Sequence, residues 1–205
     1  MSTPMASSRF VSHIKWWFFF VPLIAVLVMP AIPDRSWFSI KDEEVKSVVS
    51  IVGADRADEA VALTNARFRR WFVQSGLVRS TMNAAGSGEI SDGGMSDLAQ
   101  AWVHNFWLEI YRVVYRATVM KLFVLGTLVF CVAAFVDGTV RRKIKASAAG
   151  FASPLSFHLA GHGILLVFGV SFAVLVLPVP IYAQCWIAVA AILGALLWKA
   201  ASSYQ

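Results

Sequence analysis

Charge is scarce in this sequence. Only 15% of the 205 residues are Asp, Glu, Lys or Arg, whereas 58% are hydrophobic. An average soluble domain carries about 25% charged residues, so this composition excludes an ordinary water-soluble domain. Carboxylates are absent from every long apolar run of the chain. Proton pumps and many transporters use acidic residues inside the membrane, so this absence argues against both classes.

Cysteine is also rare, with only Cys131 and Cys185. Their positions in two different apolar runs predict depths that differ by about 20 Å, whereas the Cα atoms of a disulfide lie within about 7 Å. Both are therefore predicted to be small buried hydrophobic residues that form no disulfide. The sequence also lacks a phosphate-binding loop and a nucleophile elbow. These absences predict a protein that is not an enzyme and binds no cofactor.

Four apolar runs approach or reach the length of about 20 residues that a helix needs to cross a hydrocarbon core of about 30 Å. The predicted fold class is therefore an all-α membrane protein with four transmembrane helices. The predicted regions are an N-terminus with the first helix (1–33), a helical domain outside the membrane (34–116), the second helix (117–136), a basic loop (137–156), a hairpin of the third and fourth helices (157–198) and a tail (199–205).

The basic loop predicts the orientation of the chain. It contains Arg141, Arg142, Lys143 and Lys145, and short loops rich in Lys and Arg stay on the cytoplasmic side of a membrane. Both termini are then cytoplasmic, and in a bacterial inner membrane residues 34–116 are periplasmic. The same four residues are predicted to contact anionic lipids or a protein partner. Direct binding of nucleic acid is not expected, because the membrane rule already accounts for the basic excess.

Helix signals divide the region outside the membrane. Ser39 is predicted to cap a helix that ends at Gly53, and a second helix is predicted from about Asp55 to Ser75. The two helices would form an αα-hairpin. Residues 80–94 are rich in Ser, Gly, Ala and Asn, so they cannot bury enough apolar surface to offset their ordering entropy and are predicted to form a mobile loop.

A long helix is predicted to follow this loop. Ser96 would cap it, and it would run without a break from about Asp97 to Phe135, so that a stalk outside the membrane continues into the second span. The stalk carries an apolar stripe that is predicted to pack against the hairpin or a partner protein. The stripe consists of Trp102, Phe106, Ile110 and Val113.

Arg67, Arg69 and Arg70 form the strongest polar patch of residues 34–116. They lie near a predicted helix end, where positive charge interacts favourably with the helix dipole. They can also contact a partner protein, and the sequence leaves both interpretations open.

A second polar group lies beside the basic loop. His158 and His162 are four residues apart, a spacing that can bind a metal, but Asp137 is the only further ligand at a matching depth. We therefore predict a structural polar cluster of Asp137, Arg141, His158 and His162 and no metal. Asp137 would pair with Arg141 if the helix continues through Gly138, and would meet His158 if the helix ends there.

The same region resembles a family of membrane proteins from conjugative elements, the TraJ-like proteins encoded beside the TraI relaxase and the TraD coupling ATPase. The resemblance rests on Phe135, Val136, Asp137, Gly138, Arg141, Arg142, Ser153, Pro154, His158 and His162, and on the stalk aromatics Trp102, Trp107, Tyr111 and Tyr115. It implies a non-enzymatic inner-membrane component of a type IV secretion system in a plasmid or integrative conjugative element. It also implies a TraD-like coupling ATPase as partner within a multi-subunit or oligomeric complex that transfers DNA.

Two alternatives from other classes remain at this stage. An accessory subunit of a membrane transporter would use polar residues within the helix bundle. A metal-binding membrane protein would use His158 and His162 with at least one further ligand.

Overall fold

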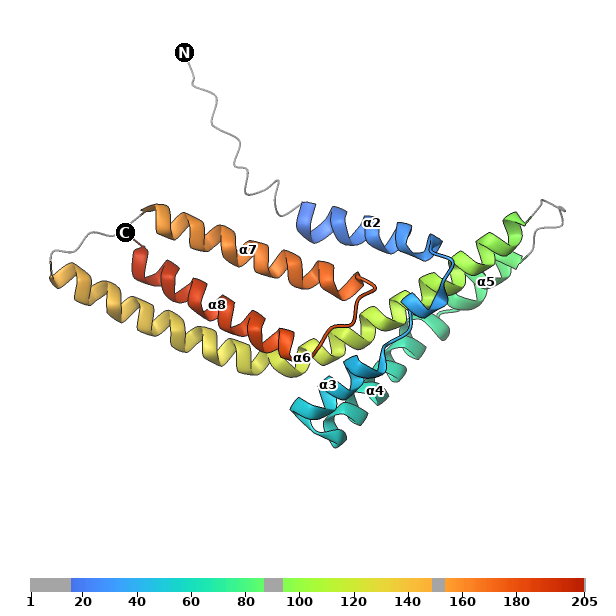
Figure 1. The fold of residues 1–205 in the computed structure, drawn as a ribbon, viewed down its shortest axis with the longest axis horizontal. Coiled ribbons are helices and arrows are strands. Elements are labelled where there is room, and N and C mark those ends of the chain that lie inside the picture. Colours follow the sequence, from blue (N-terminus) through green and yellow to red (C-terminus); the bar gives the residue numbers. More distant parts are fainter. Residues whose placement is uncertain (1–15, 87–93, 149–153, 205) are drawn as a thin grey trace, which may run out of the picture. The chain divides into compact units, whose positions relative to one another are not determined.

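The computed structural model describes residues 16–86, 94–148 and 154–204. Every regular element within these residues is a helix, which confirms the predicted all-α class (Figure 1). Three helices, α6 (Met95–Ser147), α7 (Pro154–Val176) and α8 (Gln184–Ser203), are long and apolar enough to cross a membrane. A shorter apolar helical stretch, Phe18–Ala31, lies where the first span is predicted, and it contains α2 (Val21–Val28).

The chain forms two compact units, which are described separately. The described parts of the first unit are residues 16–23, 126–148, 154–173 and 189–204. Those of the second unit are residues 24–86, 94–125 and 174–188.

Helix α6 has 53 residues, so it is about 80 Å long at 1.5 Å per residue. It confirms the predicted long helix, but it continues past Phe135 to Ser147. The prediction of a loop from residue 137 is therefore wrong as far as Ser147, and the four basic residues lie on a helix. Ala, Lys and Arg are good helix formers, and Gly138 does not end the helix.

Gly138 instead permits close packing in the first unit. A Cβ atom at this position would lie 2.6 Å from the carbonyl oxygen of Trp198 on α8. A Cβ at Gly163 would lie 3.0 Å from the side chain of Leu196, so α7 and α8 also approach closely there. Ala160 of α7 is 2% exposed. Glycine at these two positions therefore allows the helices of the first unit to pack closely.

In the second unit, α3 (Asp42–Val52) and α4 (Ala54–Phe68) form the predicted αα-hairpin. Gly53 joins them with a φ of 87°, a left-handed conformation that favours glycine. A short π-helical segment, η4 (Arg69–Val73), continues α4. Ser39 does not cap α3: the N-cap position is Lys41, and the Ser39 hydroxyl donates to the carbonyl oxygen of Ser36.

Helix α5 (Leu77–Gly86) occupies the first part of the predicted mobile loop. The hydroxyl of Thr81 donates to the carbonyl of Leu77 and accepts from the indole of Trp107 on α6 at 2.9 Å. This contact outside the helix gives α5 a tertiary anchor that composition alone does not reveal. The rest of the predicted loop, residues 87–93, lies outside the described residues.

Candidate functional site

Four polar side chains line one face of the outer half of α6. Asn105, Glu109, Arg112 and Arg116 follow one another at intervals of four, three and four residues, which places them on the same side of a helix. None is more than 3% exposed. We call this set the α6 polar face, and it forms a buried polar core in the second unit.

Arg116 and Glu44 form a buried ion pair. The Arg116 guanidinium donates from Nε and Nη2 to the two carboxylate oxygens of Glu44, both at 2.8 Å. The backbone N–H of Ile181 also donates to Glu44. This two-pronged geometry satisfies both charges, which burial would otherwise destabilise by several kcal/mol.

Arg112 and Arg116 both bind the C-terminal end of α7. Arg116 donates to the carbonyl oxygens of Val174, Leu175, Leu177 and Val179. Arg112 donates to the carbonyl oxygen of Val176 at 2.9 Å. The last four carbonyls of a helix lack partners within the helix, and positive charge is favourable there. The two guanidinium groups therefore cap the C-terminus of α7.

The α6 polar face also binds the chain that precedes α3. Asn105 donates from Nδ2 to the carbonyl oxygens of Pro30 and Ile32, and Arg112 donates to that of Trp37. Residues 30–37 contain only parts of two short 3-10 helices, η2 (Met29–Ala31) and η3 (Arg35–Trp37), so several of their carbonyls need partners outside their own segment.

Glu109 is the exception within the polar face. It is 0% exposed, and neither carboxylate oxygen has a hydrogen-bond partner among the described residues. Burial raises the pKa of Glu109 to about 7, although the nearby positive charge of Arg112 opposes the rise. Burial and the neighbouring charge of Arg116 lower the pKa of Arg112 to about 10. A buried carboxyl group that is close to half protonated at neutral pH is unusual outside functional sites.

The predicted apolar stripe on the stalk is out of phase with the buried face. Trp102, Phe106, Ile110 and Val113 are all only partly buried. Trp102 and Phe106 stack on each other with ring centres 5.4 Å apart. The stripe was misplaced because the buried residues of this part of α6 are the α6 polar face and other apolar side chains, among them Trp107, Val114 and Tyr115.

The αα-hairpin packs on α6 through aromatic rings. Phe68 of α4 makes edge-to-face contacts with Trp107 and Tyr111, with ring centres 6.1 and 5.4 Å apart. The Tyr111 hydroxyl donates to Asn65 at 2.7 Å. Docking of the hairpin against α6 is therefore confirmed, but through different residues from those predicted.

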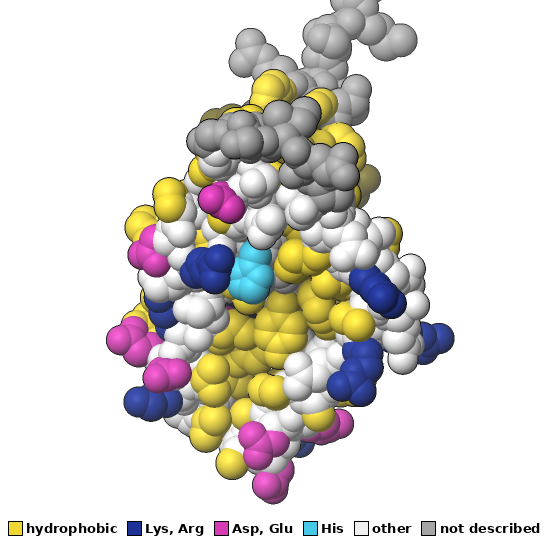
Figure 2. Space-filling view, turned by 90° about the vertical axis from the view of Figure 1, so that its right-hand side faces the viewer, with side chains coloured by type: hydrophobic (Ala, Val, Ile, Leu, Met, Phe, Trp, Pro, Cys, Tyr) yellow, Lys and Arg dark blue, Asp and Glu magenta, His cyan; other side chains and the backbone are white. Residues whose placement is uncertain are grey.

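The arginines of the predicted polar patch have different environments. Arg67 is partly buried and donates to the hydroxyl of Thr118 at 2.9 Å, so it has a structural contact. Arg69 and Arg70 are exposed on η4 beside Trp71, which is 54% exposed. Figure 2 shows a face with hydrophobic side chains near its middle and charged side chains around its edge.

In the first unit, Asp137 accepts a hydrogen bond from the indole N–H of Trp198 at 2.6 Å. The guanidinium carbon of Arg141 lies 5.1 Å from the centre of the same indole ring. The predicted ion pair between Asp137 and Arg141 is wrong, because the one ion pair within the described residues joins Arg116 and Glu44. Both side chains instead contact the same tryptophan of α8.

Arg142 lies over the ring of Tyr204, with the guanidinium carbon 5.5 Å from the ring centre. Lys143 is exposed and Lys145 is partly buried. The four basic residues near the C-terminal end of α6 are therefore not equivalent, because Arg141 and Arg142 contact aromatic rings of the C-terminal segment.

The two histidines are not brought together with metal ligands. His158 has a ring contact with Phe157, with centres 5.7 Å apart. In the described residues, no group of three or more His, Cys, Asp or Glu side chains could hold a metal ion, so the alternative of a metal site at His158 and His162 gains no third ligand there. Cys131 and Cys185 are free thiols, but the prediction that both are buried is wrong, because Cys131 is only partly buried and Cys185 is exposed.

The α6 polar face was not predicted from the sequence, and neither was a role for Glu44, Arg112 or Arg116. A signal was present, because four polar residues recur with helical spacing in an otherwise aromatic and apolar segment. The partners of these side chains are mostly carbonyl groups of segments far away in the chain. A sequence pattern cannot identify such partners.

Comparison with curated proteins and with solved structures finds no match to this chain. A family model, described as IncC plasmid conjugative DNA transfer protein DtrJ-like, matches residues 36–205. The match includes α3 to α8, and therefore both the α6 polar face and the basic end of α6. It confirms the family type that the sequence resemblance indicated. The chain belongs to the DtrJ-like family of conjugative DNA transfer proteins.

Proposed function

We propose that this protein is a non-enzymatic inner-membrane subunit of a conjugative type IV secretion system, where it scaffolds the coupling ATPase during DNA transfer. The family match over residues 36–205 is the observation that carries the proposal. Three apolar helices support a place in a membrane, and the long continuous α6 suits a scaffold.

The proposal includes four spans with both termini in the cytoplasm and residues 34–116 in the periplasm. The stretch Phe18–Ala31 would be the first span, although its helical length of about 21 Å is less than the hydrocarbon thickness. Short spans are accommodated by local thinning of the bilayer and by flanking side chains that reach the interface.

The topology is testable with reporter fusions. A reporter that is active only in the periplasm should work when inserted within residues 87–93, and should fail when fused after Lys145 or at the C-terminus. Activity at both internal sites would exclude the four-span arrangement.

The exposed patch of Arg69, Arg70 and Trp71 is the proposed contact for a protein partner. Arg and Trp dominate the energetics of many interfaces, and Trp71 is 54% exposed although it is apolar. Arg67 is not included, since it already donates to Thr118 within the second unit.

The function is tested by deleting the gene and measuring transfer of the element between cells. Transfer should be lost, and the tagged protein should co-purify with the coupling ATPase in mild detergent. Replacing Arg69, Arg70 and Trp71 by Gln, Gln and Ala should reduce both co-purification and transfer. The matched control replaces two other exposed arginines, Arg56 and Arg79, by Gln.

Transfer at the wild-type frequency in the deletion strain would refute the role in conjugation. Transfer lost without any association with the ATPase would refute the scaffolding role and leave the conjugation role intact.

A further inference from the structure

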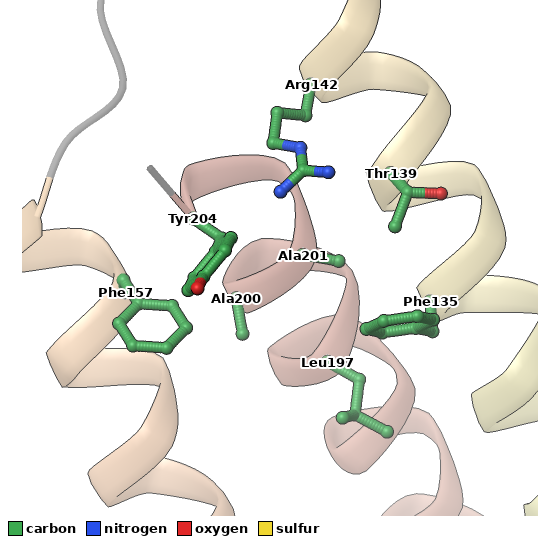
Figure 3. A pocket seen from close by; sticks show the side chains of 8 residues that line it. All are labelled: Phe135, Thr139, Arg142, Phe157, Leu197, Ala200, Ala201 and Tyr204. Atoms are coloured by element: carbon green, nitrogen blue, oxygen red, sulfur yellow. The ribbon is translucent and has the colours of Figure 1, made fainter.

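A cavity of about 350 Å³ lies among α6, α7 and α8 in the first unit. Figure 3 shows the side chains that line it, with Arg142 directed from α6 towards the C-terminal end of α8. The lining residues are Phe135, Thr139 and Arg142 of α6, Phe157 of α7, Leu197, Ala200 and Ala201 of α8, and Tyr204 directly after α8. This volume is within the range of about 300–1,000 Å³ that is typical of small-molecule sites.

The cavity exists because large and small side chains alternate around it. Gly138 brings the backbones of α6 and α8 together next to it. Ala200 and Ala201 are then too short to fill the space beside Thr139, while the rings of Phe135, Phe157 and Tyr204 form its borders (Figure 3). The hydroxyl of Thr139 donates to the backbone carbonyl of Val136, so it is already satisfied within the helix.

Arg142 is the one charged residue of the lining, and it is partly buried. Its observed contact is with the ring of Tyr204. Among residues 16–86, 94–148 and 154–204, no carboxylate lies within ion-pair distance of its guanidinium. The nearest acidic position in the sequence, Asp137, is hydrogen-bonded to Trp198. The Arg142 nitrogens are not among the buried polar atoms without a partner, so they remain accessible at the edge of the cavity, where an anion can approach them.

An apolar cavity lies next to a guanidinium that has no ion pair among the described residues, and these two features match the two parts of a phospholipid. We propose that this cavity is a binding site for an anionic phospholipid, with an acyl chain among the apolar side chains and the phosphate beside Arg142. Basic pockets between membrane helices recognise anionic headgroups in this way. A soluble phosphate ester would leave the apolar lining unused, so the lipid is the occupant that fits the whole site.

This proposal differs from general attraction between a basic segment and an anionic membrane. General attraction would depend about equally on Arg141, Arg142, Lys143 and Lys145, because screened surface charges act additively. A defined site depends on Arg142 and on the shape of the cavity. The chain offers a matched control, since Arg141 also lies over an aromatic ring but does not line the cavity.

The test is lipid binding by the full-length protein, measured by native mass spectrometry in detergent with added phosphatidylglycerol or phosphatidylethanolamine. The wild type should retain phosphatidylglycerol in preference to phosphatidylethanolamine. Arg142→Gln should lose about tenfold in affinity for phosphatidylglycerol, which corresponds to about 1.4 kcal/mol. Arg141→Gln should retain the wild-type preference.

Two further measurements separate the parts of the site. Ala200→Phe should fill the cavity and weaken binding of both lipids while Arg142 is unchanged. Glycerol phosphate, which has the anion but no acyl chain, should not displace the lipid. Unfolding temperatures of the variants in the same detergent identify any loss of binding that is due to misfolding.

Equal losses in Arg141→Gln and Arg142→Gln would overturn the proposal in favour of general electrostatic attraction. Unchanged binding in a folded Ala200→Phe variant, or displacement by glycerol phosphate, would overturn the part assigned to the acyl chain. The proposal does not depend on the role in conjugation, because the binding assay contains no other protein.

Discussion

Glu109 makes the stability of the second unit depend on pH. Its carboxyl group is 0% exposed and has no hydrogen-bond partner among the described residues, and burial raises its pKa from 4.5 to about 7. The folded protein therefore binds a proton at this site more tightly than the unfolded chain. The contribution of the Glu109 carboxyl group to the free energy of unfolding is therefore fully present below about pH 4.5. It is lost as the pH rises through about 7.

The size of the effect follows from the two pKa values. They differ by about 2.5, and each unit corresponds to about 1.4 kcal/mol, so the free energy of unfolding should fall by up to about 3 kcal/mol between pH 4.5 and pH 8. Glu109→Gln removes the ionisable group and keeps its shape. The variant should match the wild type near pH 5 and be more stable at pH 8.

The assay is unfolding of the purified protein in mild detergent, followed by tryptophan fluorescence at several pH values. The measured quantity is the difference between variant and wild type, because other groups titrate in both proteins. Glu59→Gln changes an exposed glutamate of α4 and serves as the control. If Glu109→Gln and the wild type respond equally to pH between 5 and 8, the assignment of the buried proton to Glu109 is incorrect.

Two further pairs of variants test the packing, one pair for each unit. Glu44→Gln should destabilise the protein by about 3–5 kcal/mol, because it leaves the buried Arg116 without its counterion, whereas Glu43→Gln on the exposed side of α3 should have a small effect in the same denaturation assay. Gly138→Ala should cost about 1–3 kcal/mol through overlap with the backbone of α8, whereas Gly161→Ala, where a Cβ meets no atom within 4 Å, should be neutral or stabilising. Equal effects within either pair would contradict the assigned contacts.

The features that were predicted correctly depend on local sequence signals. Apolar length predicts α6, α7 and α8, and Gly53 predicts the turn of the hairpin, because each signal acts over a few neighbouring residues.

The errors have a different origin. Gly138 was a possible helix end by its local sequence, and only the nearby backbone of α8 explains why glycine is needed inside the helix. Residues 80–86 of α5 were predicted as part of a loop from their composition, yet a hydrogen bond from Trp107 holds Thr81. In both cases a contact from a distant part of the chain decides the local structure, which overrides intrinsic propensity.

The α6 polar face shows why the apolar stripe was a poor guide to the buried side of α6. Guanidinium groups can be buried when they bind several carbonyl oxygens, and Arg116 binds a carboxylate as well as four carbonyls. Val174 and Leu175 belong to the last turn of α7, whose carbonyls need partners that their own helix cannot supply, and Leu177 and Val179 belong to the segment directly after it. The arginines of α6 and the carbonyls at the end of α7 therefore satisfy each other's need for hydrogen-bond partners. Since α3 supplies Glu44, this core is complete only when α3, α6 and the end of α7 are all in place.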